Sequence, residues 1–279
     1  FQNRRGFAPM IECRTCGWVP KCKNCDVSLT YHKYHNQLVC HYCGYTIQLP
    51  PHCPECQSTE LKMMGFGTEK VEEEIASLFP AAKVERLDFD TARTRTAYER
   101  IISDFEKGKT QILIGTQMLS KGLDFGNVSV VGILNADNLM NYPDFRAHER
   151  AFQLMVQVSG RAGRRDKRGT VVLQTSQPEH PLIRMVQHFA YREMVRLQLS
   201  ERSMFRYPPY YRLIVLVLRS RNETVLQEMS TIYAEKLRVR LGERVLGPVT
   251  PPVTRVQTLH IKKIVLKIEI AAAIAPVRE

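Results

Sequence analysis

The chain has 279 residues and a formal net charge of +12, with 40 Lys and Arg against 28 Asp and Glu. A hydrophobic fraction of 44% and a charged fraction of 24% exclude a disordered or low-complexity chain and indicate roughly two globular domains. The longest aliphatic run, residues 213–218, is too short to cross a bilayer, and no signal-peptide core opens the chain. We therefore expect a cytoplasmic protein without a membrane partner, whose basic charge favours a polyanion such as nucleic acid.

The eight cysteines all lie between positions 13 and 56, in four C-x-x-C pairs. The thiolates of one pair can converge on a single tetrahedral ion, and two pairs complete a closed zinc site with no position open for water. Four disulfides or a redox-active pair are the alternatives, and a chain without a secretory signal does not favour them. We predict two structural zinc ions, whose ligands are Cys13, Cys16, Cys22, Cys25, Cys40, Cys43, Cys53 and Cys56.

The spacing of the pairs suggests which of them share an ion. Cys25 and Cys40 are separated by 14 residues, close to the loop length of a zinc ribbon, so the second and third pairs are predicted to bind one ion. The first and fourth pairs then close the segment in a nested arrangement. Four histidines between positions 32 and 52 could replace a cysteine, but four complete pairs leave no ligand missing.

From position 61 onwards the sequence alternates between strands and amphipathic helices. Strands are predicted at 83–87, 111–114, 128–134 and 169–174, and helices at 71–78, 95–106 and 145–158. Such alternation is typical of an α/β fold with a parallel sheet and helices on its faces. Ligand-binding loops in these sheets follow the carboxyl ends of the strands.

No segment of the chain is expected to bind the phosphates and the magnesium ion of a nucleotide by itself. Gly108-Lys109-Thr110 resembles the end of a P-loop, but Ser103 stands where that motif requires glycine, and a helix precedes it. Asp137 follows a predicted strand without an acidic neighbour, so we interpret it as a loop acid.

Two arginines, Arg161 and Arg164, stand three apart in the sequence QVSGRAGR of residues 157–164. This spacing places both guanidinium groups on one face of a helical turn with little bulk around them. Planar guanidinium groups suit phosphate oxygens and the charge of a phosphoryl-transfer transition state. A solvated basic helix end is the plainer alternative.

Three segments together resemble the second RecA-like lobe of superfamily 2 helicases. They are IGTQMLSKGLDF (114–125), NYPDFRAHER (141–150) and QVSGRAGR (157–164), which look like motifs V, Va and VI. The C-x-x-C array within such a lobe narrows the resemblance to the helicases of bacterial replication restart. It implies the C-terminal half of an ATP-dependent 3′→5′ DNA helicase that recognises forks and D-loops and initiates primosome assembly. The alternative is a non-catalytic, zinc-containing nucleic-acid adaptor.

The resemblance also implies roles for individual residues. Arg164 would be the arginine finger directed at the γ-phosphate of ATP, with Arg161 beside it, while Asp124, Gly122 and Gln157 would contribute to the nucleotide site. ATP and Mg²⁺ would be held mainly by a lobe upstream of residue 1, so this chain alone should hydrolyse little or no ATP. The DNA contacts implied, in part through the backbone, are Arg4, Arg5, Thr68, Thr116, Gln117, Lys121, Lys262 and Lys263.

The expected partners are branched and single-stranded DNA, single-stranded-DNA-binding protein and other primosome proteins, and we expect a monomer. Single positions also have a simpler alternative: the side chain of Thr116, for example, would then cap a turn and have no contact with DNA.

The predicted domains are the start of the lobe (1–12), the zinc-binding segment (13–56), the lobe itself (57–200) and a small α+β domain (201–279). The last contains predicted strands at 213–219, 244–246 and 260–270 and a helix at 223–241. Its 14 Lys and Arg against 7 Asp and Glu give +7 of the total +12. Arg255, Lys262, Lys263 and Lys267 gather near the last strand, which suggests a face that docks DNA or protein. A basic sheet edge that only resists aggregation is the alternative.

Overall fold

The computed structural model describes residues 10–33, 35–65, 67–116, 119, 125–163 and 169–272. The chain divides into two compact units, one of residues 1–18, 30–37 and 48–196, the other of residues 19–29, 38–47 and 197–279. The cysteine segment therefore contributes to both units. Within the described ranges, no helix is long and apolar enough to cross a membrane.

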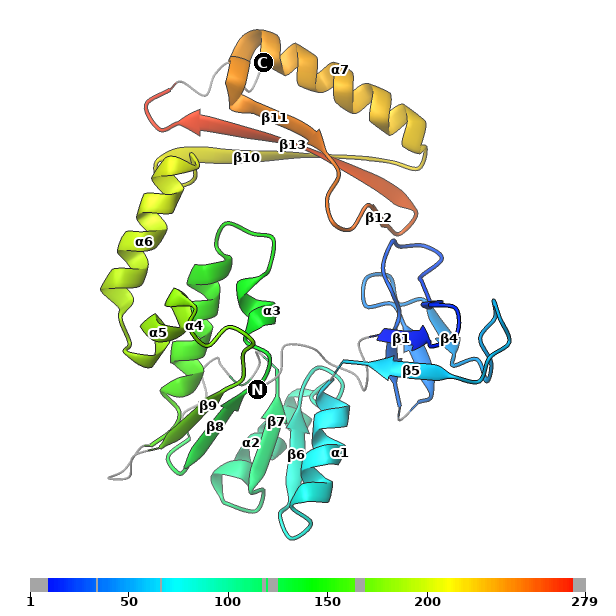
Figure 1. Cartoon of the computed structure of the whole chain (residues 1–279), viewed down its shortest axis with the longest axis vertical. Coiled ribbons are helices and arrows are strands. Elements are labelled where there is room, and N and C mark those ends of the chain that lie inside the picture. Colours follow the sequence, from blue (N-terminus) through cyan, green and yellow to red (C-terminus); the bar gives the residue numbers. More distant parts are fainter. Residues whose placement is uncertain are drawn as a thin grey trace. The chain divides into compact units, whose positions relative to one another are not determined.

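The first unit contains parallel strand pairs with helices around them, as the alternating sequence predicted (Figure 1). Strand β6 (Val84–Leu87) pairs with β7 (Ile112–Gly115), and β8 (Val130–Ile133) pairs with β9 (Thr170–Leu173). The principal helices are α1 (Thr68–Leu78), α2 (Arg95–Glu106) and α4 (Ala147–Ser159). The predicted α/β class is confirmed.

Helix α2 shows how local sequence sets these boundaries. The Thr94 side chain accepts a hydrogen bond from the Ala97 N–H at 3.2 Å, which caps the helix start. Ile101 and Ile102 face the core, and Gly108 follows the helix with φ of +72°. The stretch that resembled a P-loop is thus a helix C-terminus that needs a left-handed residue.

Two apolar clusters are formed by the described residues of this unit. The larger surrounds α4 and β8 and includes Ile133, Phe152 and the fully buried Met155, while the smaller lies between α2 and the β6–β7 pair. Val128 packs against both clusters and so joins the two strand pairs. Three further helices, α3 (Asp137–Met140), α5 (Pro181–Gln187) and α6 (Tyr191–Met204), were not predicted.

The cysteine segment is built from short strands. Strand β1 (Met10–Cys13) pairs antiparallel with β5 (Leu61–Met64), which brings the two ends of the segment together. Strands β2 (Thr30–His32), β3 (Gln37–Val39) and β4 (Thr46–Gln48) form a three-stranded sheet between those ends.

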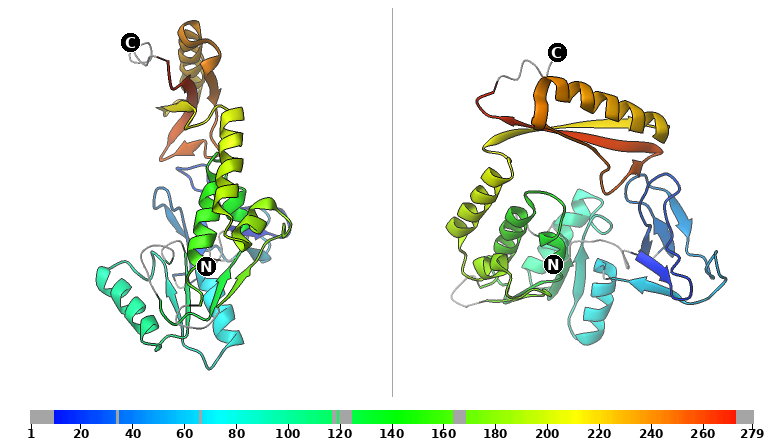
Figure 2. Two further views of the ribbon diagram at one scale, coloured as in Figure 1. Left: turned by 90° about the vertical axis from the view of Figure 1, so that its left-hand side faces the viewer. Right: turned by 45° about the horizontal axis from the view of Figure 1, so that its top comes forward.

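The C-terminal part is an antiparallel sheet with a long helix on one face (Figure 2). The sheet order is β10 (Tyr211–Ser220), β13 (Leu259–Glu269) and β11 (Val245–Val249), and β12 (Arg255–Val256) adds a short pairing with β13. Helix α7 (Glu223–Leu241) begins at Asn222, whose side chain accepts from the Val225 N–H at 3.1 Å, and a 3-10 turn (Gly242–Arg244) follows it. The predicted α+β class of this part is confirmed.

Candidate metal centres and motor site

The eight cysteines form two separate groups of four, with the pairing that their spacing predicted. Cys13 and Cys16 meet the fourth pair, Cys53 and Cys56, across the β1–β5 end of the segment. The second and third pairs form the other group, and within each group all four sulfur atoms lie within 4.8 Å of one another. All eight are free thiols, so the disulfide alternative does not describe this structure.

The sulfur positions suit a tetrahedral ion. Zn–S bonds of about 2.3 Å in tetrahedral geometry separate sulfur atoms by roughly 3.8 Å. The observed separations are 3.6 Å for Cys13–Cys56 and Cys16–Cys53, and 3.5 Å for Cys22–Cys43. Each group therefore offers four sulfurs at the spacing that zinc requires, and both sites are closed to additional ligands.

Backbone amides directed at the sulfurs favour the thiolate form that zinc binds. Hydrogen bonding from the backbone of Cys16 lowers the pKa of Cys13 to about 6, although burial opposes the shift. In the second group, the backbone of Tyr45 lowers the pKa of Cys43 to about 7. Each group thus has one thiol with a lowered pKa, whereas in the second group burial raises the pKa values of Cys22, Cys25 and Cys40, and binding of a metal ion would displace their protons.

The first motor-like motif, residues 114–125, begins at the carboxyl end of strand β7. Thr116 follows β7 directly, and its carbonyl accepts the Leu119 N–H at 3.0 Å. A side chain at Gly115 would come within 2.7 Å of both Leu119 and the Leu87 carbonyl, so only glycine fits at this strand end. The predicted phosphate-binding loop thus begins from a tightly packed position, while Gln117, Lys121, Gly122 and Asp124 lie outside the described residues.

The arginine block begins at the end of α4. Gln157 is exposed in the last turn, and Arg161 follows the helix with a half-buried side chain. Gly163 has φ of +83° and donates its N–H to the Val128 carbonyl at 3.0 Å. A side chain at Gly169 would come within 2.4 Å of the Gly163 nitrogen. The small residues of the block thus let the backbone pack closely before Arg164, which lies outside the described residues together with Arg4 and Arg5.

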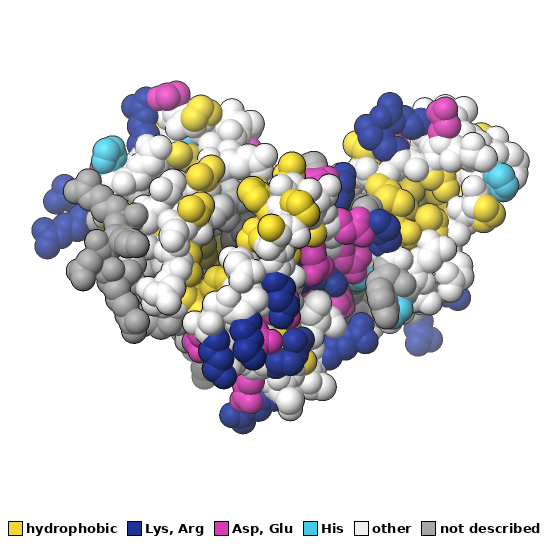
Figure 3. Space-filling model, turned by 90° about the horizontal axis from the view of Figure 1, so that it is seen from below, with side chains coloured by type: hydrophobic (Ala, Val, Ile, Leu, Met, Phe, Trp, Pro, Cys, Tyr) yellow, Lys and Arg dark blue, Asp and Glu magenta, His cyan; other side chains and the backbone are white. Residues whose placement is uncertain are grey.

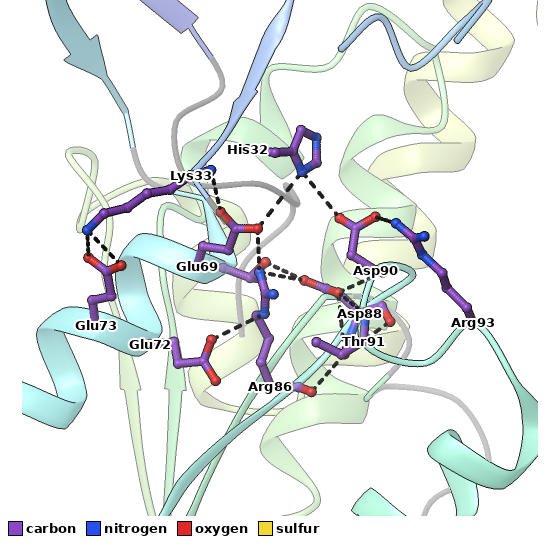
Figure 4. A network of polar contacts seen from close by, with 11 residues as sticks. His32, Lys33, Glu69, Glu72, Glu73, Arg86, Asp88, Asp90, Thr91 and Arg93 are labelled. Carbon is purple, nitrogen blue, oxygen red and sulfur yellow. Dashed lines mark hydrogen bonds and ion pairs between the residues drawn. The ribbon is translucent and has the colours of Figure 1, made fainter. Parts of the chain in front are cut away.

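A network of polar side chains lies at the carboxyl end of β6 and includes Arg86, Asp88 and Asp90 (Figure 4). The Thr68 hydroxyl donates to Oδ2 of the fully buried Asp88 at 2.6 Å, and Arg86 lies 3.5 Å from the same carboxylate. Arg86 also lies 3.3 Å from Glu69 and from Glu72. The pKa of Glu72 is raised by burial, which the Arg86 charge partly offsets. The DNA contact proposed for Thr68 stays a prediction, and the contacts observed are within the protein.

The same network joins the cysteine segment to the lobe. His32 Nδ1 lies 3.7 Å from Asp90 and 3.9 Å from Glu69, and the Lys33 N–H donates to Glu69 at 3.1 Å. Lys33 Nζ pairs with Glu73 at 2.7 Å. Sequence motifs assigned no role to the acids that follow β6. The signal for them was their position, since polar residues directly after a buried strand often converge at the sheet edge.

The two lysines predicted as a DNA-binding pair lie on opposite faces of β13, because successive side chains of a strand alternate. Lys263 is paired in register with Val217 on the face away from Ile264 and Leu266. Lys262 Nζ donates instead to the Thr250 hydroxyl at 2.8 Å. On the face shown in Figure 3, Lys and Arg side chains lie in separate groups with acidic side chains between them.

Strand pairs, helices and motif positions define this part of the molecule as the second RecA-like lobe of a helicase, and a zinc-binding segment precedes it in the chain. A model of the helicase conserved C-terminal domain matches residues 56–166, which include the whole arginine block. A model of the PriA DNA helicase Cys-rich region matches residues 22–47, which hold the Cys22/Cys25/Cys40/Cys43 group.

Curated relatives agree over nearly the whole chain. The replication restart protein PriA of Bacillus subtilis is 41% identical over 269 residues, 96% of this chain and 33% of that protein. Those of Synechocystis and Haemophilus influenzae are 41% and 40% identical over 92% and 91% of this chain, or 32% and 35% of those proteins. The chain belongs to the PriA family and spans about a third of the length of these relatives.

Proposed function

We propose that this chain supplies the second motor lobe, the zinc-binding segment and the C-terminal domain of an ATP-dependent 3′→5′ DNA helicase of bacterial replication restart. The similarity to proteins named replication restart protein, over 96% of the chain in the first case, carries the proposal. The arginine block after α4 gives it a chemical basis, because a helicase lobe of this kind supplies arginine to a nucleotide held by another lobe.

In this proposal Arg164 stabilises the charge that develops on the γ-phosphate, and Arg161 lies beside it. Gly122, Asp124 and Gln157 complete the nucleotide site, while ATP and Mg²⁺ are held mainly by a lobe outside this chain. The two zinc ions are structural, since each cysteine group fills its own coordination sphere.

A strand-end loop and the C-terminal charge support the DNA-binding part of the proposal. Thr116, Gln117 and Lys121 follow strand β7, and the backbone amides of such loops commonly bind phosphate. Forks and D-loops are the proposed substrates in the bacterial cytoplasm. The C-terminal charge of +7 suits DNA or an acidic protein tail, such as that of single-stranded-DNA-binding protein.

The decisive experiment uses the full-length protein and the Arg164→Ala variant. We expect DNA-stimulated ATP turnover to fall by about 10³-fold or more, since an arginine finger contributes about 10³–10⁵ in rate. Binding of single-stranded DNA should stay within roughly twofold, and two zinc ions should be retained. Arg95→Ala is the control, because Arg95 is exposed on α2 and pairs only with Glu99 among the contacts described.

Two results would contradict the proposal. ATP turnover of Arg164→Ala equal to that of the parent would remove the arginine-finger role. A full-length protein that binds forked DNA but shows no DNA-stimulated ATP hydrolysis would support the zinc-containing adaptor instead.

A further inference from the structure

The four C-x-x-C turns share one backbone pattern. In each, the N–H of the first cysteine donates to the carbonyl five residues later, at 2.8–2.9 Å. The four pairs are Cys13 with Trp18, Cys22 with Val27, Cys40 with Tyr45, and Cys53 with Ser58. The common pattern makes any departure in a single turn informative.

Three of the turns are completed by their own residues. Gly17, Gly44 and Gln57 have positive φ, and each donates its N–H at 2.9 Å to the carbonyl of the first cysteine in its turn. The second cysteine of each of these turns accepts a backbone hydrogen bond from two residues further on. The donors are Trp18 for Cys16, Tyr45 for Cys43 and Ser58 for Cys56.

The Cys22–Cys25 turn is completed by the C-terminal domain instead. The Asp26 N–H, which corresponds to those of Gly17 and Gly44, donates to the Arg255 carbonyl at 2.8 Å. The backbone donor to the Cys25 sulfur is the Gln257 N–H, at 3.3 Å. Residues more than 200 positions away thus take the places that neighbours fill in the other three turns.

Two more contacts fix the same junction. The Thr258 N–H donates to the Asn24 carbonyl at 2.8 Å, and the Thr254 hydroxyl donates to Asp26 Oδ2 at 2.7 Å. Together with the previous pair they make four hydrogen bonds between residues 24–26 and residues 254–258. All of these residues belong to the second compact unit.

The turn that makes these contacts is held in an unfavourable backbone conformation. Arg255 pairs with His260 and Val256 with Leu259, so Gln257 and Thr258 form a two-residue hairpin loop. Their φ angles are +50° and +69°, which such loops require but which glycine or asparagine adopts more easily. Two successive residues of this kind are unfavourable on their own, so contacts elsewhere must hold them.

We propose that the Gln257–Thr258 turn is an integral part of the Cys22/Cys25/Cys40/Cys43 zinc site. The ion at this site fixes the C-terminal domain to the Cys22–Cys25 turn, whereas the ion at the Cys13/Cys16/Cys53/Cys56 site does not involve that domain. The two zinc ions, equivalent in their ligands, therefore differ in what they stabilise.

The chemistry of a four-cysteine zinc site explains why a single amide matters. Four thiolates around Zn²⁺ leave a net charge of −2, and amides that donate to the sulfurs spread that charge and orient the ligands. Cys25 obtains this donor from Gln257. By linkage, zinc binding stabilises the docked turn, and the docked turn raises the affinity for zinc by the same factor.

The first test measures release of both zinc ions from the zinc-loaded protein to a chromogenic chelator. Gln257→Pro removes the amide donor and cannot adopt the positive φ. We expect one of the two ions to be released about tenfold faster, in line with the usual effect of a lost hydrogen-bond partner of a metal ligand, and the other at an unchanged rate. The matched control replaces Gln257 with Asn and Thr258 with Gly, which keeps the amide and suits the turn, and both rates should stay as in the parent.

A milder variant distinguishes a local effect on the zinc site from general unfolding caused by Gln257→Pro. Thr254→Val removes only the hydroxyl that donates to Asp26 and should speed release of one ion by roughly threefold. Thr231→Val is its control, because this threonine of α7 donates to the Gln227 carbonyl within its own helix. Equal rates for Thr254→Val and Thr231→Val, or equal acceleration of both ions in Gln257→Pro, would overturn the proposal.

The effect of the zinc site on the Gln257–Thr258 turn can be measured without a metal assay. In Cys25→Ser, hydrogen exchange at the Gln257 and Thr258 amides should accelerate at least tenfold, while amides in the middle of α7 keep their protection. In Cys16→Ser, the matched variant at the other site, exchange at the same two amides should not change. Identical exchange at Gln257 and Thr258 in both variants would also refute the proposal.

Discussion

The lobe and the cysteine segment lie in one chain but obtain their order in different ways. Fourteen buried residues around α4 and β8 pack in a single cluster of the lobe. In the described residues from β1 to β5, the buried side chains include five cysteines and only a few aliphatic residues, among them Ile11, Leu29 and Leu38. The lobe is held by area removed from water, and the segment by its sulfur groups. The periodicity of apolar residues therefore predicts the structure of the lobe, whereas the spacing of the cysteines predicts that of the segment.

Removal of the zinc ions should reveal the largest difference in stability between the two regions. Structural zinc contributes on the order of 10 kcal/mol per site, more than the few aliphatic contacts of the segment can replace. We expect chelation with EDTA to abolish amide protection in residues 10–64 while protection in α4 persists. Addition of Zn²⁺ should restore the segment. Unchanged protection in residues 10–64 after quantitative zinc removal would show that the segment folds without metal.

The sequence predicted well whatever depends on near neighbours. The bounds of α2 and α7 were predicted to the residue, because a capping side chain and a following glycine mark both ends. The pairing of the cysteines was predictable because loop length limits which thiolates can meet. Helix α6 was missed, because Met194 and Gln198 are its only fully buried residues among many exposed ones, which gives a weak periodic signal.

Contacts between distant segments were beyond sequence reasoning. Nothing in residues 22–26 indicates that Arg255 and Gln257 complete their turn, since the Cys53–Cys56 turn also lacks a glycine after its second cysteine and is completed by its own residues. Likewise, the resemblance to helicases implied a DNA contact at Thr68, and the burial of this side chain against Asp88 became apparent only in three dimensions. Motif positions were predictable from the sequence, whereas the partners of each side chain were not.

A substitution in the core of the lobe should have the opposite pattern to metal removal: it should destabilise the lobe and leave the cysteine segment intact. Met155 is fully buried in the α4 cluster, so Met155→Ala should lower the free energy of unfolding of the lobe by about 2–5 kcal/mol. Urea unfolding followed by far-UV circular dichroism measures the loss. Zinc content should stay at two ions per chain, since the sulfur groups lie outside the α4 cluster. Gln153→Ala, at an exposed position of the same helix, is the control and should change stability by less than about 0.5 kcal/mol.

The smallest loss of stability is expected at a site in the lobe where a carboxylate, and no metal ion, connects the ends of two strands. Asp137, at the start of α3 after β8, accepts hydrogen bonds from the Thr175 hydroxyl at 2.5 Å and from the Ser176 N–H and hydroxyl at 2.8 Å. Both donors follow β9, so a single carboxylate ties the ends of the strand pair. Burial raises its pKa, but these hydrogen bonds act together in the opposite direction, and the net pKa is lowered.

This anchor, unlike a zinc site, should respond to mild acid. A pKa that is lower in the folded than in the unfolded protein gives stability that is present above the unfolded value of about 4 and is lost as pH falls through the folded value. Asp137→Asn should therefore cost about 1–2 kcal/mol at pH 7, and the difference from the parent should shrink below pH 4. Urea unfolding of both proteins between pH 3 and 7 measures it. A difference that stays constant over that range would mean that the carboxylate charge is not what joins the strands.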